Sequence, residues 1–346
     1  MRILYIAYPL LPVTDASAGG AEQMLGTLER EMHRRGHATT VAACAGSQVA
    51  GRLIATGSAP TETDTFEQRN REHQAVIHEL LRRESFDVIH DKSGSFFANA
   101  DQVQTPLLAT LHLPRSFYGD VDWHGLPSQI RLNCVSAAQA HTFADVLNVA
   151  GWVLNGIAVE RFPLRTEKDN YLLWMGRICE EKGPHLAIQV AMQTGRRLVI
   201  AGQVYPFRYH QEYFAREIKP HLSEAIEFVD TPSFERKLEL LARASALLVP
   251  SLVDETSSLV SLEAMSCGTP VIAFRRGALP EIVHDGITGF VVDDLPAMSE
   301  SVERLGEISP EACRAHVEQH FSATRMADDY LKLYQAMMGH AMGEAA

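Results

Sequence analysis

The sequence of 346 residues contains only five cysteines, and no two of them form a C-x-x-C pair. Scattered cysteines of this kind predict neither a zinc site nor a disulfide framework. Cys134, Cys179 and Cys267 lie in or beside apolar runs, which indicates that these thiols pack in the core.

Long hydrophobic runs are also missing, since no stretch approaches the roughly 20 apolar residues of a membrane-spanning helix. The apolar start has Arg2 as its single basic residue and lacks a small-residue cleavage site. It therefore predicts a first β-strand instead of a signal peptide. We expect a cytoplasmic protein that does not associate with membranes.

Positive charge is in deficit. The chain has 31 Lys and Arg residues and 43 Asp and Glu residues, so its net charge is −12. This balance argues against binding to nucleic acid and, less strongly, against docking on anionic lipid. A G-x-G-x-x-G motif is absent as well, which disfavours a dinucleotide-binding dehydrogenase.

The overall composition is that of a soluble globular chain, with a hydrophobic content of 46% and a charged content of 21%. The length predicts two domains. Short apolar runs alternate with amphipathic helical segments, a pattern that predicts parallel sheets in an α/β fold. We place the linker between the domains in the polar segment 161–170.

The strongest local pattern lies at residues 246–274. An apolar strand at 246–249 is followed by a polar loop, a short helix that begins near Leu259 and a second buried strand. Ligands of a parallel sheet bind at the carboxyl ends of its strands, beside helix N-termini. Ser257 and Ser258 can cap this helix and leave backbone N–H groups that face an anion.

Two carboxylates bracket this predicted site, Glu255 in the loop and Glu263 inside the helix. A carboxylate beside an anion site can accept hydrogen bonds from ligand hydroxyls. The combination suits a phosphorylated sugar better than a bare phosphate.

A second candidate anion site is the loop Gly176-Arg177-Ile178-Cys179-Glu180-Glu181-Lys182-Gly183, which follows an apolar strand. Arg177 and Lys182 are five residues apart in this glycine-bounded loop and can hold a diphosphate from two directions. Arginine offers a bidentate fork, and lysine offers a mobile point charge.

The first half of the chain carries weaker signals of the same kind. Gly19 and Gly20 follow the first strand at the start of a helix, where glycines let a ligand approach the backbone closely. His90 and His112 lie at the carboxyl ends of two predicted strands, where ligand-facing residues of an α/β sheet lie.

Asp120 and Asp122 form a D-x-D sequence, but no strand directly precedes them. D-x-D is a metal-binding motif of an unrelated enzyme fold, and three residues match it easily by chance. We interpret this segment as a surface loop.

Together these motifs resemble the retaining glycosyltransferases of family 4, which have the GT-B fold. Glu255, seven residues and Glu263, followed by Ala-Met-Ser-Cys-Gly-Thr-Pro-Val, match the E-x7-E signature of that family. The G-R-x-x-x-x-K-G loop, the G-G-x-E loop and the T-x-H sequence before His112 also resemble the family pattern. The family usually has Pro-Phe-Gly or similar after the first glutamate, where this chain has Thr256-Ser257-Ser258.

The resemblance implies two Rossmann-like parallel-sheet domains that face a central cleft. Residues 1–160 would bind the acceptor, residues 161–321 would bind the nucleotide sugar, and a C-terminal helix at 322–346 would return to the first domain.

The resemblance also implies site residues. His112, Glu255, Arg177 and Lys182 are the expected catalytic residues. Donor binding is expected from Gly19, Gly20, Arg177, Lys182, Val229, Glu255, Thr256, Ser257, Ser258, Leu259, Val260 and Glu263. The expected acceptor-side residues are His90, Asp120 and Asp122.

The implied activity is a hexosyltransferase that moves a sugar from a nucleotide-sugar donor to an acceptor hydroxyl with retention of configuration. UDP-sugars are favoured as donors and GDP-mannose comes second. Neither a metal nor another cofactor is expected, and the acceptor is expected to be a soluble small molecule or glycan. Two alternatives stay open: a sugar-nucleotide epimerase of the same fold, and a sugar-nucleotide-binding protein without turnover.

Overall fold

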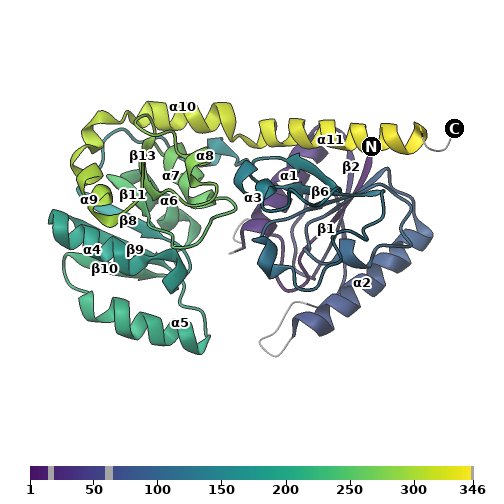
Figure 1. The fold of residues 1–346 in the computed structure, drawn as a ribbon, viewed down its shortest axis with the longest axis horizontal. Coiled ribbons are helices and arrows are strands. Elements are labelled where there is room, and N and C mark those ends of the chain that lie inside the picture. Colours follow the sequence, from purple (N-terminus) through teal and green to yellow (C-terminus); the bar gives the residue numbers. More distant parts are fainter. Residues whose placement is uncertain (15–18, 59–64, 344–346) are drawn as a thin grey trace. The chain divides into compact units, whose positions relative to one another are not determined.

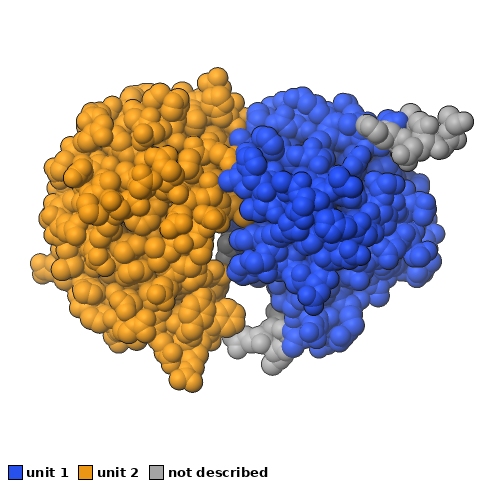
Figure 2. All heavy atoms as spheres, viewed as in Figure 1, with its two compact units in different colours: residues 1–156, 323–346 blue, residues 157–322 orange. Residues whose placement is uncertain are grey.

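The computed structural model describes residues 1–14, 19–58 and 65–343. The chain divides into two compact units (Figure 2). Unit 1 comprises residues 1–156 and 323–346, and unit 2 comprises residues 157–322. The boundaries expected from the sequence, after residues 160 and 321, lie within a few residues of these.

Unit 1 is built on a seven-stranded parallel sheet with the order β3-β2-β1-β4-β5-β6-β7. Its elements are β1 (Arg2–Ile6), α1 (Gly20–Arg34), β2 (Ala38–Ala43), β3 (Arg52–Ala55), α2 (Phe66–Arg83), β4 (Val88–Asp91), η1 (Phe96–Asn99), β5 (Leu107–Thr110), η2 (Arg115–Phe117), β6 (Ile130–Cys134), α3 (Ala137–His141), β7 (Val149–Trp152) and α11 (Ala323–Gly343). The central strands are almost continuously apolar because helices cover both faces of such a sheet.

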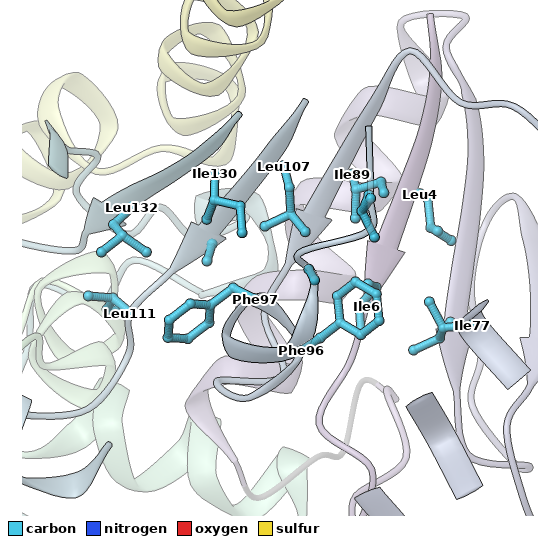
Figure 3. Packing of buried hydrophobic residues seen from close by; sticks show 14 of the residues in the cluster. Leu4, Ile6, Ile77, Ile89, Phe96, Phe97, Leu107, Leu111, Ile130 and Leu132 are labelled. Carbon is cyan, nitrogen blue, oxygen red and sulfur yellow. The ribbon is translucent and has the colours of Figure 1, made fainter. Parts of the chain in front are cut away.

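The core of unit 1 lies against one face of this sheet (Figure 3). Phe96 and Phe97, from the short helical turn after β4, belong to the same cluster as Leu107 and Ile130 of the neighbouring strands. Both phenylalanines are fully buried, and Ile77 of α2 closes the same cluster. This packing fixes the loop that leaves the carboxyl end of β4.

The final helix, α11, belongs to unit 1 and packs beside α1 (Figure 1). Tyr330 and Tyr334 on α11 are fully buried. The Tyr334 hydroxyl lies 2.5 Å from Nδ1 of His90 on β4, and the Tyr330 hydroxyl lies 3.2 Å from Oγ1 of Thr110 on β5. The predicted return of the last helix to the first domain is therefore confirmed.

Unit 2 is built on a six-stranded parallel sheet with the order β10-β9-β8-β11-β12-β13. Its elements are η3 (Val159–Arg161), β8 (Tyr171–Met175), η4 (Glu180–Lys182), α4 (Pro184–Thr194), β9 (Arg197–Gly202), α5 (Arg208–Tyr213), the π-helical segment η5 (Phe214–Ile218), η6 (Lys219–His221), β10 (Ile226–Asp230), α6 (Phe234–Arg243), β11 (Ala246–Val249), α7 (Leu259–Ser266), β12 (Val271–Phe274), α8 (Leu279–Ile282), β13 (Gly289–Val292), α9 (Leu295–Glu303), η7 (Leu305–Glu307) and α10 (Pro310–His320).

Both sheets have the strand order of a doubly wound Rossmann-like fold, so the predicted fold class is confirmed. All five cysteines are buried and unpaired, as a core role predicts. Within the described ranges, no helix is both long and apolar enough to cross a bilayer.

Candidate functional site

The direction of strand addition in unit 2 reverses between β8 and β11. At such a switch point the loops leaving the two central strands diverge to opposite faces, and a ligand-sized crevice opens at the carboxyl edge. The loop after β8 carries Arg177 and Lys182, and the loop after β11 carries Glu255. The topology thus brings two motifs that are far apart in the sequence to one edge of one sheet.

Lys182 and Glu255 meet at this edge. The Lys182 ammonium lies 2.6 Å and 2.7 Å from the two carboxylate oxygens of Glu255. The Ser251 hydroxyl donates a third hydrogen bond to Glu255 Oε1 at 2.7 Å. The side chain of Glu255 is 11% exposed and that of Lys182 is 33% exposed. Both charges therefore keep a face toward solvent while they neutralise each other.

Two glycines allow the loops to approach this closely. Gly183 has a φ of 69°, and a Cβ at this position would collide with the backbone carbonyl of Pro250. Gly277 has a φ of 52°, and its Cβ would collide with the backbone of Glu255. Since an L side chain is strained at such φ values, both positions require glycine. Gly183 also precedes Pro184, which begins α4 at a position where the missing N–H costs nothing.

Arg177 lies at the same edge and contacts Glu181. The guanidinium lies 3.1 Å from Glu181 Oε1, and the hydroxyl of Tyr209 donates to the same carboxylate at 3.1 Å. Partial burial and the Glu181 carboxylate raise the pKa of Tyr209 to about 12, so this hydroxyl remains a donor at neutral pH. Glu181, which lies in the same loop as Arg177, thus holds the guanidinium in place.

The loop that replaces the family's usual Pro-Phe-Gly leads directly into α7. Ser258 is the N-cap residue of α7, but its hydroxyl lies 2.7 Å from the Ser261 hydroxyl and makes no side-chain capping bond. The capping bond that the sequence suggested for Ser258 is therefore replaced by a serine–serine contact. Thr256, Ser257, Leu259 and Val260 are all partly exposed around this helix start.

Glu263 lies inside α7 and is almost fully buried. Its Oε1 lies 2.5 Å from the ammonium of Lys237 on α6, and its side chain is 6% exposed. A buried carboxylate needs such a partner, because removal of a charge from water is costly. Lys237 was not predicted from the sequence, since no motif marks it and only the packing of α6 beside α7 brings it to Glu263.

Val229 lies near the carboxyl end of β10, on the outer side of the same sheet. Two residues later Thr231 has a φ of 41°, and no other non-glycine residue of the described chain has a positive φ. This conformation is unusual for a β-branched residue. The Thr231 N–H bonds to the carbonyl of Gly202 at 3.3 Å, which draws the chain across the end of β9.

The predicted glycines of unit 1 lie where α1 begins. Gly19 is the N-cap residue of α1 and Gly20 is its first residue. Glu22, in the first turn, is 4% exposed, and burial raises the pKa of its carboxyl group. Glu22 is therefore a buried acid in the first turn of α1.

His90 and His112 lie at the carboxyl ends of β4 and β5, as predicted. His90 is fully buried, and its ring nitrogens lie 2.5 Å and 2.7 Å from the hydroxyls of Tyr334 and Thr110. Burial and the nearby Lys92 lower the pKa of both histidines well below the usual range. Both rings are therefore neutral, and His112 is the more exposed of the two.

Asp120 and Asp122 lie in the exposed loop after η2. Asp122 Oδ1 accepts hydrogen bonds from the backbone N–H groups of His124 and Gly125 at 3.3 Å and 3.0 Å, so its carboxylate shapes a local turn. Trp123, between these groups, packs on Phe143 with ring centroids 5.1 Å apart.

The structure brings Arg177, Lys182, Glu255 and residues 256–260 together around the ends of β8 and β11 and the start of α7, whereas Val229 lies apart, near the end of the edge strand β10. The unit 1 candidates lie at the ends of β1, β4 and β5. Sequence reasoning missed Ser251, Glu181 and Lys237. The signal for Glu181 was its place inside the loop between Arg177 and Lys182.

Two family models match the chain. Residues 157–317 match the model described as glycosyl transferases group 1, and residues 18–160 match the model described as glycosyltransferase family 4. A D-inositol 3-phosphate glycosyltransferase from Mycolicibacterium smegmatis is 29% identical over 185 residues, which covers 51% of this chain and 42% of that protein. The chain spans less than half the length of the curated relatives it matches.

Solved structures share the fold. AviGT4, a glycosyltransferase involved in avilamycin A biosynthesis, has a TM-score of 0.74 at 23% identity, with 98% of each chain covered. HepE of Anabaena, solved in complex with UDP-glucose, has a TM-score of 0.73 at 16% identity, with 97% of this chain and 100% of that chain covered. At these identities the likeness shows a common architecture.

Proposed function

This chain belongs to glycosyltransferase family 4 and has the GT-B fold, and on that basis we propose that it transfers a hexosyl group from a nucleotide sugar to an acceptor hydroxyl with retention of configuration. UDP-sugars are the first choice of donor and GDP-mannose is the second. The presence of UDP-glucose in the HepE complex supports this order. We place the activity in the cytoplasm and expect a soluble small molecule or glycan as acceptor.

The observation that carries the proposal is the contact of Lys182 with both oxygens of Glu255 at the switch point of unit 2. In this structure each charge compensates the other. A nucleotide sugar offers both of them new partners, since its diphosphate can take the ammonium and its sugar hydroxyls can donate to the carboxylate. Donor binding then replaces the hydrogen bonds between Lys182 and Glu255 with hydrogen bonds from each of them to the donor. Neither charge is left without a partner.

The reaction breaks the bond between the anomeric carbon and the diphosphate oxygen and forms a bond from that carbon to the acceptor oxygen. In the proposed same-face attack, the departing phosphate takes the acceptor proton. Negative charge grows on the diphosphate, and Arg177, Lys182 and the N-terminus of α7 are placed to stabilise it. Each well-placed donor contributes about 2.7–4 kcal/mol to lowering such a barrier. The proposed chemistry uses no metal.

The other predicted residues have supporting roles in this proposal. Glu263 accepts hydrogen bonds from ribose hydroxyls, and Lys237 keeps it oriented. Val229 and the strained turn at Thr231 lie where main-chain groups can recognise the base. Unit 1 binds the acceptor, and His112 supplies a neutral imidazole that can exchange hydrogen bonds with sugar hydroxyls.

The testing experiment is a thermal melt of the full chain with UDP, GDP, ADP and TDP in the presence of a chelator. A ligand that binds only the native state raises the melting temperature by mass action. We expect a shift with UDP that is lost in Lys182→Ala and kept in Lys219→Ala, an exposed lysine of the same unit.

The matching UDP-sugar is then incubated with and without candidate acceptors, and products are followed by proton NMR. Acceptor-dependent release of UDP with an α-linked product from an α-linked donor supports the proposal. Isomerisation of the donor sugar without acceptor would instead identify an epimerase. Binding without either reaction would identify a sugar-nucleotide-binding protein.

A further inference from the structure

A group of three metal-binding side chains lies in unit 2, at the carboxyl ends of β8 and β9. One thiol, one carboxylate and one imidazole, from Cys179, Glu181 and His210, place their ligand atoms within 4.8 Å of one another. Cys179 and Glu181 are two positions apart in the loop after β8, and His210 comes from α5. No zinc-binding spacing is visible in the sequence, because the third side chain comes from a helix 29 positions beyond Glu181.

His210 is the member of this group that most needs a ligand. Its side chain is 1% exposed. Neither ring nitrogen has a hydrogen-bond partner among the residues that the structure describes. A buried polar group without a partner lowers the stability of the fold. The unpartnered imidazole of His210 therefore reduces the stability of the protein. Coordination of a metal ion by one of its ring nitrogens would restore that stability.

We propose that Cys179, Glu181 and His210 bind a divalent transition-metal ion, with zinc as the preferred ion. Sulfur, nitrogen and carboxylate oxygen are the ligands that zinc takes in proteins, commonly in a tetrahedral arrangement. Three protein ligands leave the fourth position open to water or to a group of another molecule. Calcium and magnesium prefer oxygen ligands and fit this group poorly.

The present contacts of Cys179 and Glu181 are ones that a bound metal ion can replace. The Cys179 thiol donates to the Arg177 carbonyl at 3.4 Å, and metal binding replaces the thiol proton. Glu181 is held by the Arg177 guanidinium and by the Tyr209 hydroxyl. A metal ion on one oxygen of Glu181 takes over the charge compensation that Arg177 now supplies.

The position of His210 is fixed by the helix that carries it. Tyr213, one turn further along α5, bonds through its hydroxyl to Nδ1 of His185 on α4 at 2.6 Å. The ring of Tyr209 packs on His210 with centroids 4.1 Å apart. These contacts orient the imidazole before any ion arrives, which lowers the entropy cost of binding.

The test is a titration of the full chain, after chelator treatment, with cobalt and with zinc. A cobalt ion bound by a cysteine thiolate has a strong charge-transfer absorption in the near ultraviolet, which histidine and carboxylate ligands do not give. We expect this band at one equivalent of cobalt, and its loss when zinc is added. Calorimetry with zinc should give one site that weakens by about tenfold or more in Cys179→Ser and in His210→Ala.

Two controls separate this group from other metal-binding residues. Cys44→Ser changes a buried thiol of unit 1 and should leave the cobalt band intact. His284, His316 and His320 form a second histidine group, with ring centroids 5.1 Å and 6.0 Å apart, that can collect zinc at the surface. His316→Ala should leave the cobalt band and the zinc affinity unchanged.

Four results would overturn the proposal. The wild-type protein could bind cobalt without the thiolate band, or bind no metal. Zinc affinity could survive in both Cys179→Ser and His210→Ala, with their folding verified by circular dichroism. The affinity could also be lost only in His316→Ala, which would assign the metal to the surface histidines.

Discussion

The ammonium of Lys182 lies 2.6 Å and 2.7 Å from the two carboxylate oxygens of Glu255, although 73 positions separate the residues. We predict that Lys182→Ala and Glu255→Ala each lower glycosyl transfer by about 10²-fold or more, because each removes a group that we propose contacts the donor. Lys182 is 33% exposed and can be hydrated in Glu255→Ala, and the Ser251 hydroxyl still donates to Glu255 in Lys182→Ala, so both variants should remain folded. Turnover is compared with Lys219→Ala and Glu224→Ala, which change exposed residues of unit 2. Normal turnover in both site variants would place the donor elsewhere.

Gly183 has a close neighbour and Gly195 has none, although both have left-handed backbone conformations. Gly183→Ala places a Cβ against the carbonyl of Pro250, whereas a Cβ at Gly195 meets nothing within 4 Å. We expect Gly195→Ala to cost about 1–2 kcal/mol from backbone strain alone. Gly183→Ala should cost distinctly more and should also weaken nucleotide binding. Equal losses in urea unfolding would show that the Pro250 contact relaxes freely.

Lys237 keeps the charge of Glu263 compensated inside unit 2. Lys237→Met leaves an almost buried carboxylate without its cation, and we expect a loss of about 3–5 kcal/mol in the free energy of unfolding. The double variant Lys237→Met with Glu263→Gln removes both charges and should recover most of that loss. Urea unfolding of the wild type, both single variants and the double variant completes the cycle. If the loss in the double variant equals the sum of the losses in the two single variants, Lys237 and Glu263 are not directly coupled.

Lys92, after β4 in unit 1, is a buried lysine whose ammonium has no hydrogen-bond partner within the described part of the chain. Its Nζ lies 5.1 Å from the centre of the Tyr330 ring, and His90 and His112 are its titratable neighbours. Burial lowers its pKa from 10.5 to about 7. In this range the unfolded chain binds a proton that the folded chain does not.

Stability therefore rises with pH between about pH 7 and pH 10.5 through this group. We predict that Lys92→Met is more stable than the wild type at pH 7, and that the difference shrinks as the pH approaches 10.5. Below pH 7 both states bind the proton, so the difference should stay constant. Unfolding is measured across this range with Lys332→Met, an exposed lysine on α11, as the control. A difference that does not depend on pH would mean that Lys92 remains charged in the folded protein.

Local patterns in the sequence were sufficient for the architecture and for the motif loops. Apolar runs such as the one that forms β8 predict buried strands because helices cover both faces of the sheet. Arg177, Lys182 and Glu255 could be identified because each lies in a loop between a strand and a helix, and such loops gather at one edge of a parallel sheet.

The partners of those residues could not be predicted in the same way. The contacts of Glu263 with Lys237 and of Glu181 with Tyr209 depend on how helices pack over the sheet, and no short pattern encodes that packing. The partner of Ser258 could not be predicted either, although it lies only three positions away in the sequence. Its hydroxyl could cap α7 or bond to Ser261 one turn later, and only the three-dimensional structure shows that it bonds to Ser261.

The return of α11 to unit 1 has a consequence for biosynthesis. Tyr330 and Tyr334 supply buried hydroxyl contacts to Thr110 and His90, so the core around β4 and β5 remains open until α11 has been translated. Unit 2 comes from one uninterrupted segment, residues 157–322, and can fold while it emerges from the ribosome. Although unit 1 begins the chain, it is therefore the last of the two to be completed, and a nascent protein arrested after unit 2 would expose an unfinished first sheet to chaperones.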